Sequence, residues 1–281
     1  MRFLSRVVSI VTTASTLIST SFGAGANNTS LRILPIGDSI TWGYGSSDGN
    51  GYRLNLLNLL FGNSVTYLGH WHSGNMTNNN NEGYPAREIS DIESYVKGNG
   101  TLAQSPNLIL ILAGTNDISR DHAASTAPER LGSLIDLVTT ACPDAAVIVS
   151  EITPISHIWG PEQQARVEVF NAAIPGIVKM RNSSASSSKH ILALKMSSYV
   201  AEDDLADALH PSDIGYQKMA IGWIDGIKQV AEMGWLNVNI TDPKIKEPVG
   251  STGKNDGSRF GDSLGGTFMS LAFLWALLVG L

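Results

Sequence analysis

The sequence ILPIGDSIT at residues 33–41 is the stretch from which the fold of this chain is best predicted. It begins with an apolar run of the kind found in strands that are buried on both faces. The run ends at Gly37, which permits a tight turn. In open α/β folds, functional sites lie at the carboxyl ends of the strands. Ser39 is therefore a candidate nucleophile, although Gly-Asp-Ser is also found in ordinary turns.

Four more short apolar runs follow, and segments with the apolar spacing of helices separate them. The predicted strands are residues 31–36, 65–68, 107–112, 146–150 and 191–194; the predicted helices are residues 52–61, 88–96, 128–140, 161–180 with a break at Pro175, and 212–233. This alternation predicts a parallel sheet with helices on both faces. We expect a single flavodoxin-like three-layer α/β/α domain with a parallel sheet of about five strands. The Asn-rich segment 70–81 is predicted to be an exposed loop.

Polar residues follow three of the predicted strands. Ser39 follows the first, Asn116 follows residues 107–112, and Asp207 and His210 come after the last. Right-handed crossovers place the carboxyl ends of these strands at one edge of the sheet. A serine hydroxyl needs a base to accept its proton, and an Asp three residues before a His can hold the imidazole in the correct tautomer. The amide of Asn116 can donate to a developing oxyanion.

The order of these motifs resembles a known superfamily. GDSI at 37–40, GTND at 114–117 and D-x-x-H-P at 207–211 are similar to the motifs of the SGNH (GDSL-type) hydrolases, over about residues 31–235. GDSITWGYGSSDGNGYR at 37–53, EGYPAREI at 82–89 and HPSDIGYQKMA at 210–220 resemble family-three carbohydrate esterases, acetylxylan esterases among them. The resemblance implies that Ser39 is the nucleophile, with its own N–H in the oxyanion hole. It also implies that Asn116 supplies a second donor and that Asp207 and His210 complete the triad.

The third oxyanion donor departs from the superfamily pattern. That pattern, G-x-x-G, reads Gly83-Tyr84-Pro85-Ala86 in this chain. The N–H of Ala86 remains available as a donor, so Ala86 is our first choice for this position and Gly83 the second. If the site requires a positive φ, the methyl group of Ala86 costs about 1–2 kcal/mol.

Both ends of the chain carry patterns typical of targeting signals. Residues 1–26 combine basic residues, an apolar run and small residues, which indicates a cleaved signal peptide. We expect a catalytic domain at 27–240, a stalk at 241–257 and a removed glycosylphosphatidylinositol (GPI) anchor signal at 258–281, with attachment near Asn255. The alternative for the apolar tail is a tail anchor or a buried helix. The anchor would attach the protein to the outer leaflet of the plasma membrane.

Asn-x-Ser/Thr triplets are a further indication of secretion. Six of them predict glycosylation, at Asn27, Asn28, Asn75, Asn99, Asn182 and Asn239. The net charge is −6 and there is no basic run, so we expect no nucleic-acid partner. The single cysteine, Cys142, excludes an internal disulfide and a cysteine-ligated zinc site within one chain. We expect a monomer that needs no metal or organic cofactor.

The sequence therefore predicts a secreted serine esterase at the cell surface or cell wall that acts on small acyl esters, most of all acetyl, of a polysaccharide. Two alternatives remain open at this point. One is a lipid esterase or lysophospholipase on the same fold, since fold does not determine substrate. The other is a catalytically inactive cell-wall surface protein, which only the substitution at Ala86 supports. Trp42, Tyr84 and Trp159 are open to two roles, a surface for sugars or packing in the core or rim.

Overall fold

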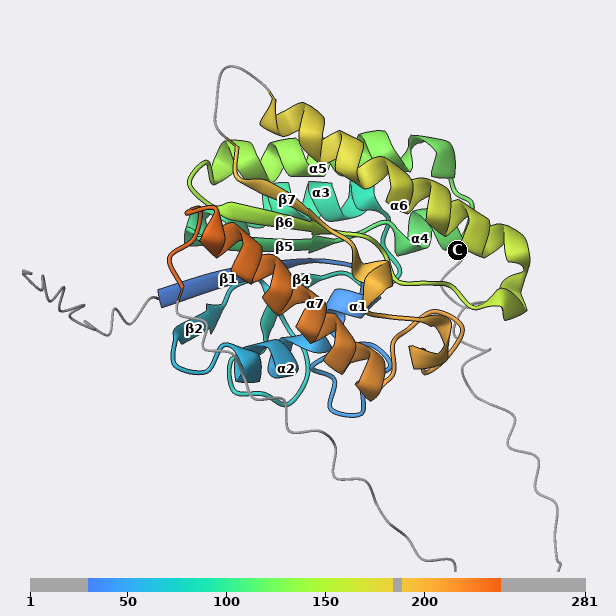
Figure 1. The fold of residues 1–281 in the computed structure, drawn as a ribbon, viewed down its shortest axis with the longest axis horizontal. Helices are drawn as coiled ribbons and strands as arrows, with labels where there is room; N and C mark the ends of the chain where they lie inside the picture. The colour runs from blue at the N-terminus through green and yellow to red at the C-terminus, as the bar shows by residue number, and fades with distance from the viewer. Residues whose placement is uncertain (1–29, 184–188, 239–281) are drawn as a thin grey trace, which may run out of the picture. The chain divides into compact units, whose positions relative to one another are not determined.

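The computed structural model describes residues 30–183 and 189–238 (Figure 1). The strands are β1 Ser30–Gly37, β2 Ser64–Tyr67, β3 Trp71–His72, β4 Asn80–Gly83, β5 Leu108–Leu112, β6 Ala146–Ser150 and β7 Ile191–Leu194. The α-helices are α1 Ser39–Trp42, α2 Tyr52–Leu59, α3 Ile89–Gly98, α4 Thr115–Ser119, α5 Ala127–Ala141, α6 Pro161–Asn182 and α7 Asp213–Glu232. Short 3-10 helices lie at Thr101–Gln104, Ala124–Thr126, His157–Trp159, Met196–Ser198 and Glu202–Asp204.

The strands form one sheet in the order β3-β4-β1-β5-β6-β7, and β2 also pairs with β1. All pairs are parallel except β3 with β4. The five strands that the sequence predicts lie in the order β2-β1-β5-β6-β7, which is the 2-1-3-4-5 order of flavodoxin-like folds. The predicted fold class is thus confirmed, with two further strands at one edge.

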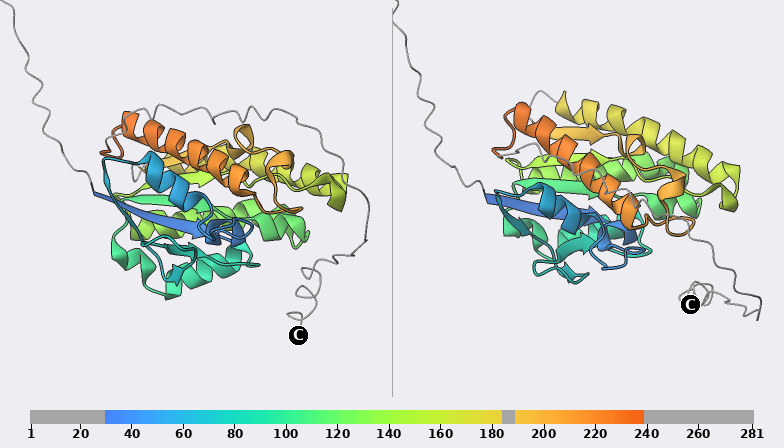
Figure 2. Two further views of the ribbon diagram at one scale, coloured as in Figure 1. Left: turned by 90° about the horizontal axis from the view of Figure 1, so that it is seen from below. Right: turned by 60° about the horizontal axis from the view of Figure 1, so that its bottom comes forward.

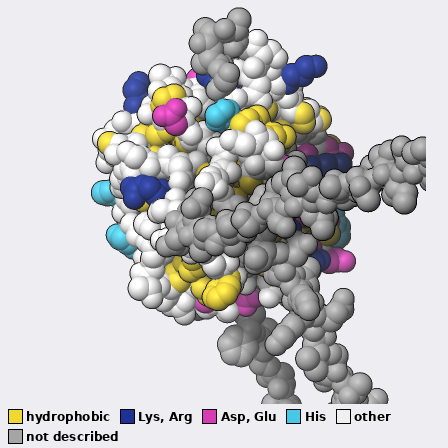
Figure 3. Space-filling model, turned by 60° about the vertical axis from the view of Figure 1, so that its left-hand side comes forward, with side chains coloured by type: hydrophobic (Ala, Val, Ile, Leu, Met, Phe, Trp, Pro, Cys, Tyr) yellow, Lys and Arg dark blue, Asp and Glu magenta, His cyan; other side chains and the backbone are white. Residues whose placement is uncertain are grey.

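Helices cover both faces of the sheet (Figures 1 and 2). α2 and α7 pack against each other on one face, whereas α3, α5 and α6 lie on the other. Every residue of β5 and β6 is buried, as their unbroken apolar sequences predict. Figure 3 shows the side at which the strands begin, where charged side chains of both signs are scattered among apolar and other groups. The strands therefore end, and α1 begins, at the opposite edge.

The Asn-rich segment 70–81 is only in part the exposed loop that its composition predicts: His70, Trp71 and His72 are exposed, but several other residues are not. It contains β3 and β4, and Ser73, Met76 and Asn81 are buried. The Asn81 amide donates to Ser73 Oγ at 2.9 Å and its oxygen accepts the Gly83 N–H at 2.9 Å. Polar side chains can be buried when each finds a hydrogen-bond partner. Such side-chain bonds explain why Ser73 and Asn81 are buried within a polar segment.

Arg53 in α2 connects the end of α1 with the turn between β3 and β4. Its side chain is fully buried, and the guanidinium donates to the carbonyl oxygens of Trp42 (3.0 Å), Ser73 (2.9 Å) and Asn79 (2.9 Å). Trp42 ends α1, whereas Ser73 and Asn79 flank the turn between β3 and β4. One side chain thus supplies donors to backbone groups that no regular ladder satisfies.

The predicted break at Pro175 is wrong, because α6 is continuous from Pro161 to Asn182. Proline removes one intrahelical hydrogen bond, but the apolar face of this helix stays packed through Phe170, Ile174 and Val178.

The predicted signal peptide, the stalk with Asn255 and the anchor signal lie outside the described residues. Among the described residues, none of the helices has the length and apolar character to cross a membrane.

Candidate active site

Strand register brings the three predicted motifs to one edge of the sheet. β1 lies between β4 and β5, and Gly37 is paired with Gly83 on one side and with Leu112 on the other. The chain leaves the sheet just beyond these three positions. Ser39, Ala86 and Asn116 therefore follow three adjacent strands within a few residues of the same edge. The sequence predicts this for Ser39 and Asn116, whereas it does not predict β4, the strand before Ala86.

The turn that presents Ser39 is built from Gly37 and Asp38. A Cβ on Gly37 would lie 2.2 Å from the carbonyl oxygen of Leu112, so only glycine fits this close approach. Asp38 is fully buried, and its Oδ1 accepts the Ile40 N–H at 3.0 Å, which caps α1. Ser39 is the first residue of α1, where an N–H has no acceptor within the helix. This N–H is therefore available to a ligand.

Ser39, His210 and Asp207 form a continuous hydrogen-bonded chain. Ser39 Oγ lies 2.9 Å from His210 Nε2, and His210 Nδ1 lies 2.9 Å from Asp207 Oδ2. Asp207 Oδ1 also accepts the backbone N–H groups of Leu209 and His210, each at 2.7 Å. Partial burial acts to raise the pKa of Asp207, but the hydrogen bonds from His210 outweigh it and hold that pKa at about 2. The ionised carboxylate can accept Nδ1–H, which leaves the Nε2 lone pair facing the serine hydroxyl.

Tyr44 lies next to His210, the candidate base, and sequence reasoning missed this neighbour. Its ring lies 4.8 Å from the His210 ring, centroid to centroid, with the two planes tilted by 48°. The Tyr216 hydroxyl donates to the Tyr44 carbonyl oxygen at 2.6 Å and holds its backbone in place. The sequence feature that could have indicated this neighbour is the position of Tyr44, five residues after Ser39 in the TWGYG sequence.

The structure distinguishes the two candidates for the third oxyanion donor. The N–H of Gly83 already donates to Asn81 Oδ1, whereas the N–H of Ala86 has no acceptor among the described residues. Asn116 donates one amide hydrogen to the carbonyl oxygen of Arg87 at 2.9 Å, which leaves its second N–H available. Ala86 is therefore better placed than Gly83 to donate to an oxyanion.

Ala86 adopts a φ of 61°, which is the left-handed region that favours glycine. We therefore expect Ala86→Gly to raise the free energy of unfolding by about 1 kcal/mol and to retain the backbone donor. Urea denaturation would measure this change. Ala165→Gly, on the exposed side of α6, is a matched control that should lower stability by about 1 kcal/mol. A loss of stability in Ala86→Gly would contradict this interpretation of its backbone.

Asp117 supports the loop that carries Ala86. Its carboxylate is fully buried, accepts the Ile89 N–H at 3.1 Å and pairs with Arg130 at 2.6 Å. Burial acts to raise the pKa of Asp117, and the hydrogen bonds from Arg130 and Ile89 oppose this effect, yet the pKa stays above its usual value. Asp117 thus joins the start of α3 to α5 rather than facing the triad.

Three of the six predicted glycosylation sites are described. Asn75 and Asn182 are exposed, whereas Asn99 is half-buried and donates its amide to Glu82 and Tyr84. Asn27, Asn28, Asn239 and the predicted anchor site Asn255 lie outside the described residues.

Within residues 30–183 and 189–238, no three His, Cys, Asp or Glu side chains are grouped so that they could hold a metal ion.

Comparison with known proteins identifies the family of this chain. The family model described as "GDSL-like Lipase/Acylhydrolase family" matches residues 36–218. The "Multidomain esterase" of Ruminococcus flavefaciens is 29% identical over 226 residues, which are 70% of this chain and 28% of that protein. The chain thus spans less than a third of this curated relative.

Two solved structures share the fold over nearly their whole length. A family 3 carbohydrate esterase of Clostridium thermocellum has a TM-score of 0.62 and 28% identity, over 73% of this chain and 99% of that one. A carbohydrate esterase family 3 protein from Talaromyces cellulolyticus has a TM-score of 0.57 and 19% identity, over 72% and 99%. The resemblance that the three motifs predict is confirmed, and the chain belongs to the GDSL-like lipase/acylhydrolase family of ester hydrolases.

Proposed function

We propose that this protein is a secreted serine esterase that removes small acyl groups, most of all acetyl, from a polysaccharide. The observation that carries the proposal is the hydrogen-bonded chain from Ser39 Oγ through His210 to Asp207, next to the free N–H groups of Ser39 and Ala86. A nucleophile, a base held by a carboxylate and preorganised donors are the parts that acyl transfer requires.

The proposed reaction has two halves. Ser39 Oγ attacks the ester carbonyl carbon while His210 Nε2 takes the hydroxyl proton, and the oxyanion accepts from the N–H groups of Ser39 and Ala86 and from Asn116 Nδ2. The sugar hydroxyl leaves with the proton from His210, and the acyl group remains as an ester on Ser39. A water molecule then loses a proton to His210 and attacks that ester, which releases the carboxylic acid and restores the serine.

The names of the relatives support a carbohydrate substrate over a lipid. The structural relative from Clostridium thermocellum is named a family 3 carbohydrate esterase, and it is matched over 99% of its length. The family description itself includes lipases, so it does not separate the two substrate classes. Acyl-chain preference is the property that distinguishes them.

A series of 4-nitrophenyl esters from acetate to octanoate would test this preference. We expect kcat/KM to fall at least about 10-fold from acetate to octanoate, because a site shaped for a small acyl group excludes the longer chain. Release of acetate from acetylated polysaccharide should accompany it. A rise in kcat/KM with chain length, together with release of fatty acid from lysophospholipid, would instead favour the lipid esterase.

The cellular location is part of the same proposal and rests on the sequence signals at residues 1–26 and 258–281. We expect the full chain, expressed in a eukaryotic cell, to be found on the outer surface through a lipid anchor. Phosphatidylinositol-specific phospholipase C should release it into the medium. Retention on the cells after this treatment would contradict the anchor.

A further inference from the structure

A cavity of about 620 Å³ lies beside the candidate active site. Such a volume is within the range of about 300–1,000 Å³ that is usual for small-molecule sites. Four aromatic side chains from separate segments line it and contact one another in sequence. The ring centroids are 5.8 Å apart for Trp42 and Trp71, 6.3 Å for Trp71 and Tyr84, and 4.9 Å for Tyr84 and Tyr95.

The cavity shares backbone with the catalytic machinery. Trp42 is the last residue of α1, the helix that Ser39 begins, and Tyr84 comes two residues before Ala86. The Tyr84 N–H donates to the carbonyl oxygen of Gly37 at 2.9 Å, which ties this wall to the end of β1. A polymer with one acylated unit at Ser39 would therefore extend a neighbouring unit toward the aromatic rings.

One wall of the cavity is held by a buried hydrogen-bonded group. The Tyr84 hydroxyl donates to Glu82, and the Asn99 amide donates to Glu82 Oε2 at 2.8 Å and to the Tyr84 hydroxyl at 3.0 Å. These bonds fix the Tyr84 ring before any ligand arrives, and preorganised rings lose little entropy on binding. A glycan on Asn99 would compete with this arrangement, so the subsite requires Asn99 to be unmodified.

The charge of the cavity differs from that of the chain. The chain carries a net charge of −6, yet the ten lining residues, all of them described, include no Asp or Glu. Arg87 lines the cavity, and its guanidinium forms no hydrogen bond or ion pair with any described residue. Arg87 follows Ala86 in the chain, and its carbonyl oxygen accepts from the Asn116 amide at 2.9 Å, so its backbone adjoins the candidate oxyanion donors. The Glu82 carboxylate behind this wall is already bonded to Tyr84 and Asn99, so the guanidinium of Arg87 is the charged group that the lining itself presents, and it is complementary to a planar carboxylate.

We propose that this cavity binds a uronic acid unit of the polysaccharide, with Arg87 pairing with its carboxylate while the rings of Trp71 and Tyr95 pack against the pyranose. This subsite rests on the proposed function, because the uronic acid would be a neighbour of the acylated sugar held at Ser39. Trp71 and Tyr95 are 41% and 40% exposed, so their rings are accessible to a ligand. The apolar faces of a sugar ring bury surface on such rings.

Binding, measured without catalysis, separates this proposal from the proposed function. The probe is xylotetraose carrying one glucuronic acid, and its matched control is the same oligosaccharide with that carboxyl group methyl-esterified. Titration calorimetry on the Ser39→Ala protein, with Asn99 shown to be unmodified by peptide mass, would give both Kd values. We expect the acid to bind at least about 10-fold more tightly than the ester, as a charge-assisted pair provides.

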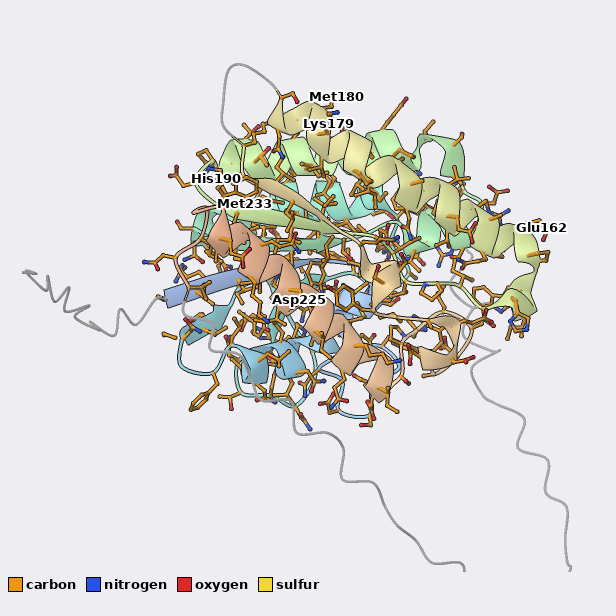
Figure 4. The ribbon with its side chains drawn as sticks, viewed as in Figure 1. Glu162, Lys179, Met180, His190, Asp225 and Met233 are labelled. Atoms are coloured by element: carbon orange, nitrogen blue, oxygen red, sulfur yellow. The ribbon has the colours of Figure 1, made fainter. Side chains whose placement is uncertain are left out.

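Two further variants, each made in the Ser39→Ala protein, assign that difference to Arg87. Arg87→Gln should make the Kd values of the acid and of its methyl ester equal. Lys179→Gln also removes one positive charge, but it should leave the acid binding more tightly than the ester. Lys179 lies in the last turn of α6, at the end opposite Glu162 and the carboxyl edge of the sheet (Figure 4). Equal Kd values in the parent protein, or a difference that persists in Arg87→Gln, would overturn the subsite. If the parent protein, with Ser39 intact, releases no acetate from any acetylated polymer, the proposed function is overturned instead.

Discussion

Ser39→Ala is expected to lower kcat/KM for an aryl acetate by about 10⁴-fold or more, because it removes the atom that attacks the ester. Ser39 is almost fully buried, and its Oγ has His210 Nε2 as its partner at 2.9 Å. Removing one small hydroxyl there leaves the packing of β1 and α1 unchanged. Stopped assays with 4-nitrophenyl acetate would measure the loss, and circular dichroism would confirm the fold.

The design of this experiment gives it two controls. Ser133→Ala, on the exposed side of α5, changes the same side chain far from the site and should keep full activity. The double variant Ser39→Ala with His210→Ala should be about as slow as either single variant, because members of a triad act as one unit. Activity that persists in Ser39→Ala would contradict the assignment. Labelling of the parent protein by a fluorophosphonate, and its loss in Ser39→Ala, would exclude the inactive surface protein.

Arg53→Met is expected to lower the free energy of unfolding by about 2–4 kcal/mol, since it removes several charge-assisted hydrogen bonds and leaves the Ser73 carbonyl without a donor. The Trp42 carbonyl keeps Ser73 Oγ as a donor, and the Asn79 carbonyl keeps Asn81 Nδ2. The carbonyl oxygens of Trp42, Ser73 and Asn79 would lose the guanidinium that now serves all three. Methionine retains the apolar stem but supplies no hydrogen bond donor. Urea denaturation at neutral pH would measure the change.

The control for Arg53→Met is Lys179→Met, which exchanges an exposed cation for the same side chain and should change stability by less than about 0.5 kcal/mol. Arg53→Lys is expected to lie between the two, because one ammonium cannot reach three carbonyl groups in different directions. A stability for Arg53→Met within about 1 kcal/mol of the parent protein would show that water or movement of the loops satisfies these acceptors. That result would contradict the role assigned to Arg53.

Ser39→Ala and Arg53→Met are expected to affect different properties, catalytic activity in the first and stability in the second. Ser39→Ala should lose activity and keep its stability, while Arg53→Met should lose stability. Because Arg53 holds the Trp42 carbonyl at the end of α1, partial loosening of that loop should also raise KM for a polysaccharide substrate. Measuring both properties in both variants therefore tests whether the loop framework and the triad are distinct parts of the site.

Local pattern was sufficient to predict most of the scaffold. The strands at β1, β2, β5, β6 and β7 were predicted because unbroken apolar runs are needed where both faces of a sheet are covered. β3 and β4 were missed, because their Asn-rich sequence carries no apolar period. What holds this segment against the rest of the fold is a set of side-chain hydrogen bonds with distant partners, such as Asn50 with Asn75 and Asn78 with the backbone of Tyr67. Such bonds depend on the fold being formed.

The sequence alone determined the candidate triad, because Ser39, Asp207 and His210 follow strand ends in an order that the parallel topology converts into proximity. Tertiary structure decided the remaining features of the site. In the folded chain the Gly83 N–H donates to Asn81, so Ala86 and not Gly83 has a free N–H, and the Tyr44 ring lies against His210. Tertiary structure also assembled the aromatic cavity from segments far apart in the chain. A motif defines residue types and spacing, but which rings meet depends on contacts between segments that no local pattern encodes, and even the local bond from the Gly83 N–H to Asn81 forms because Asn81 is buried in β4.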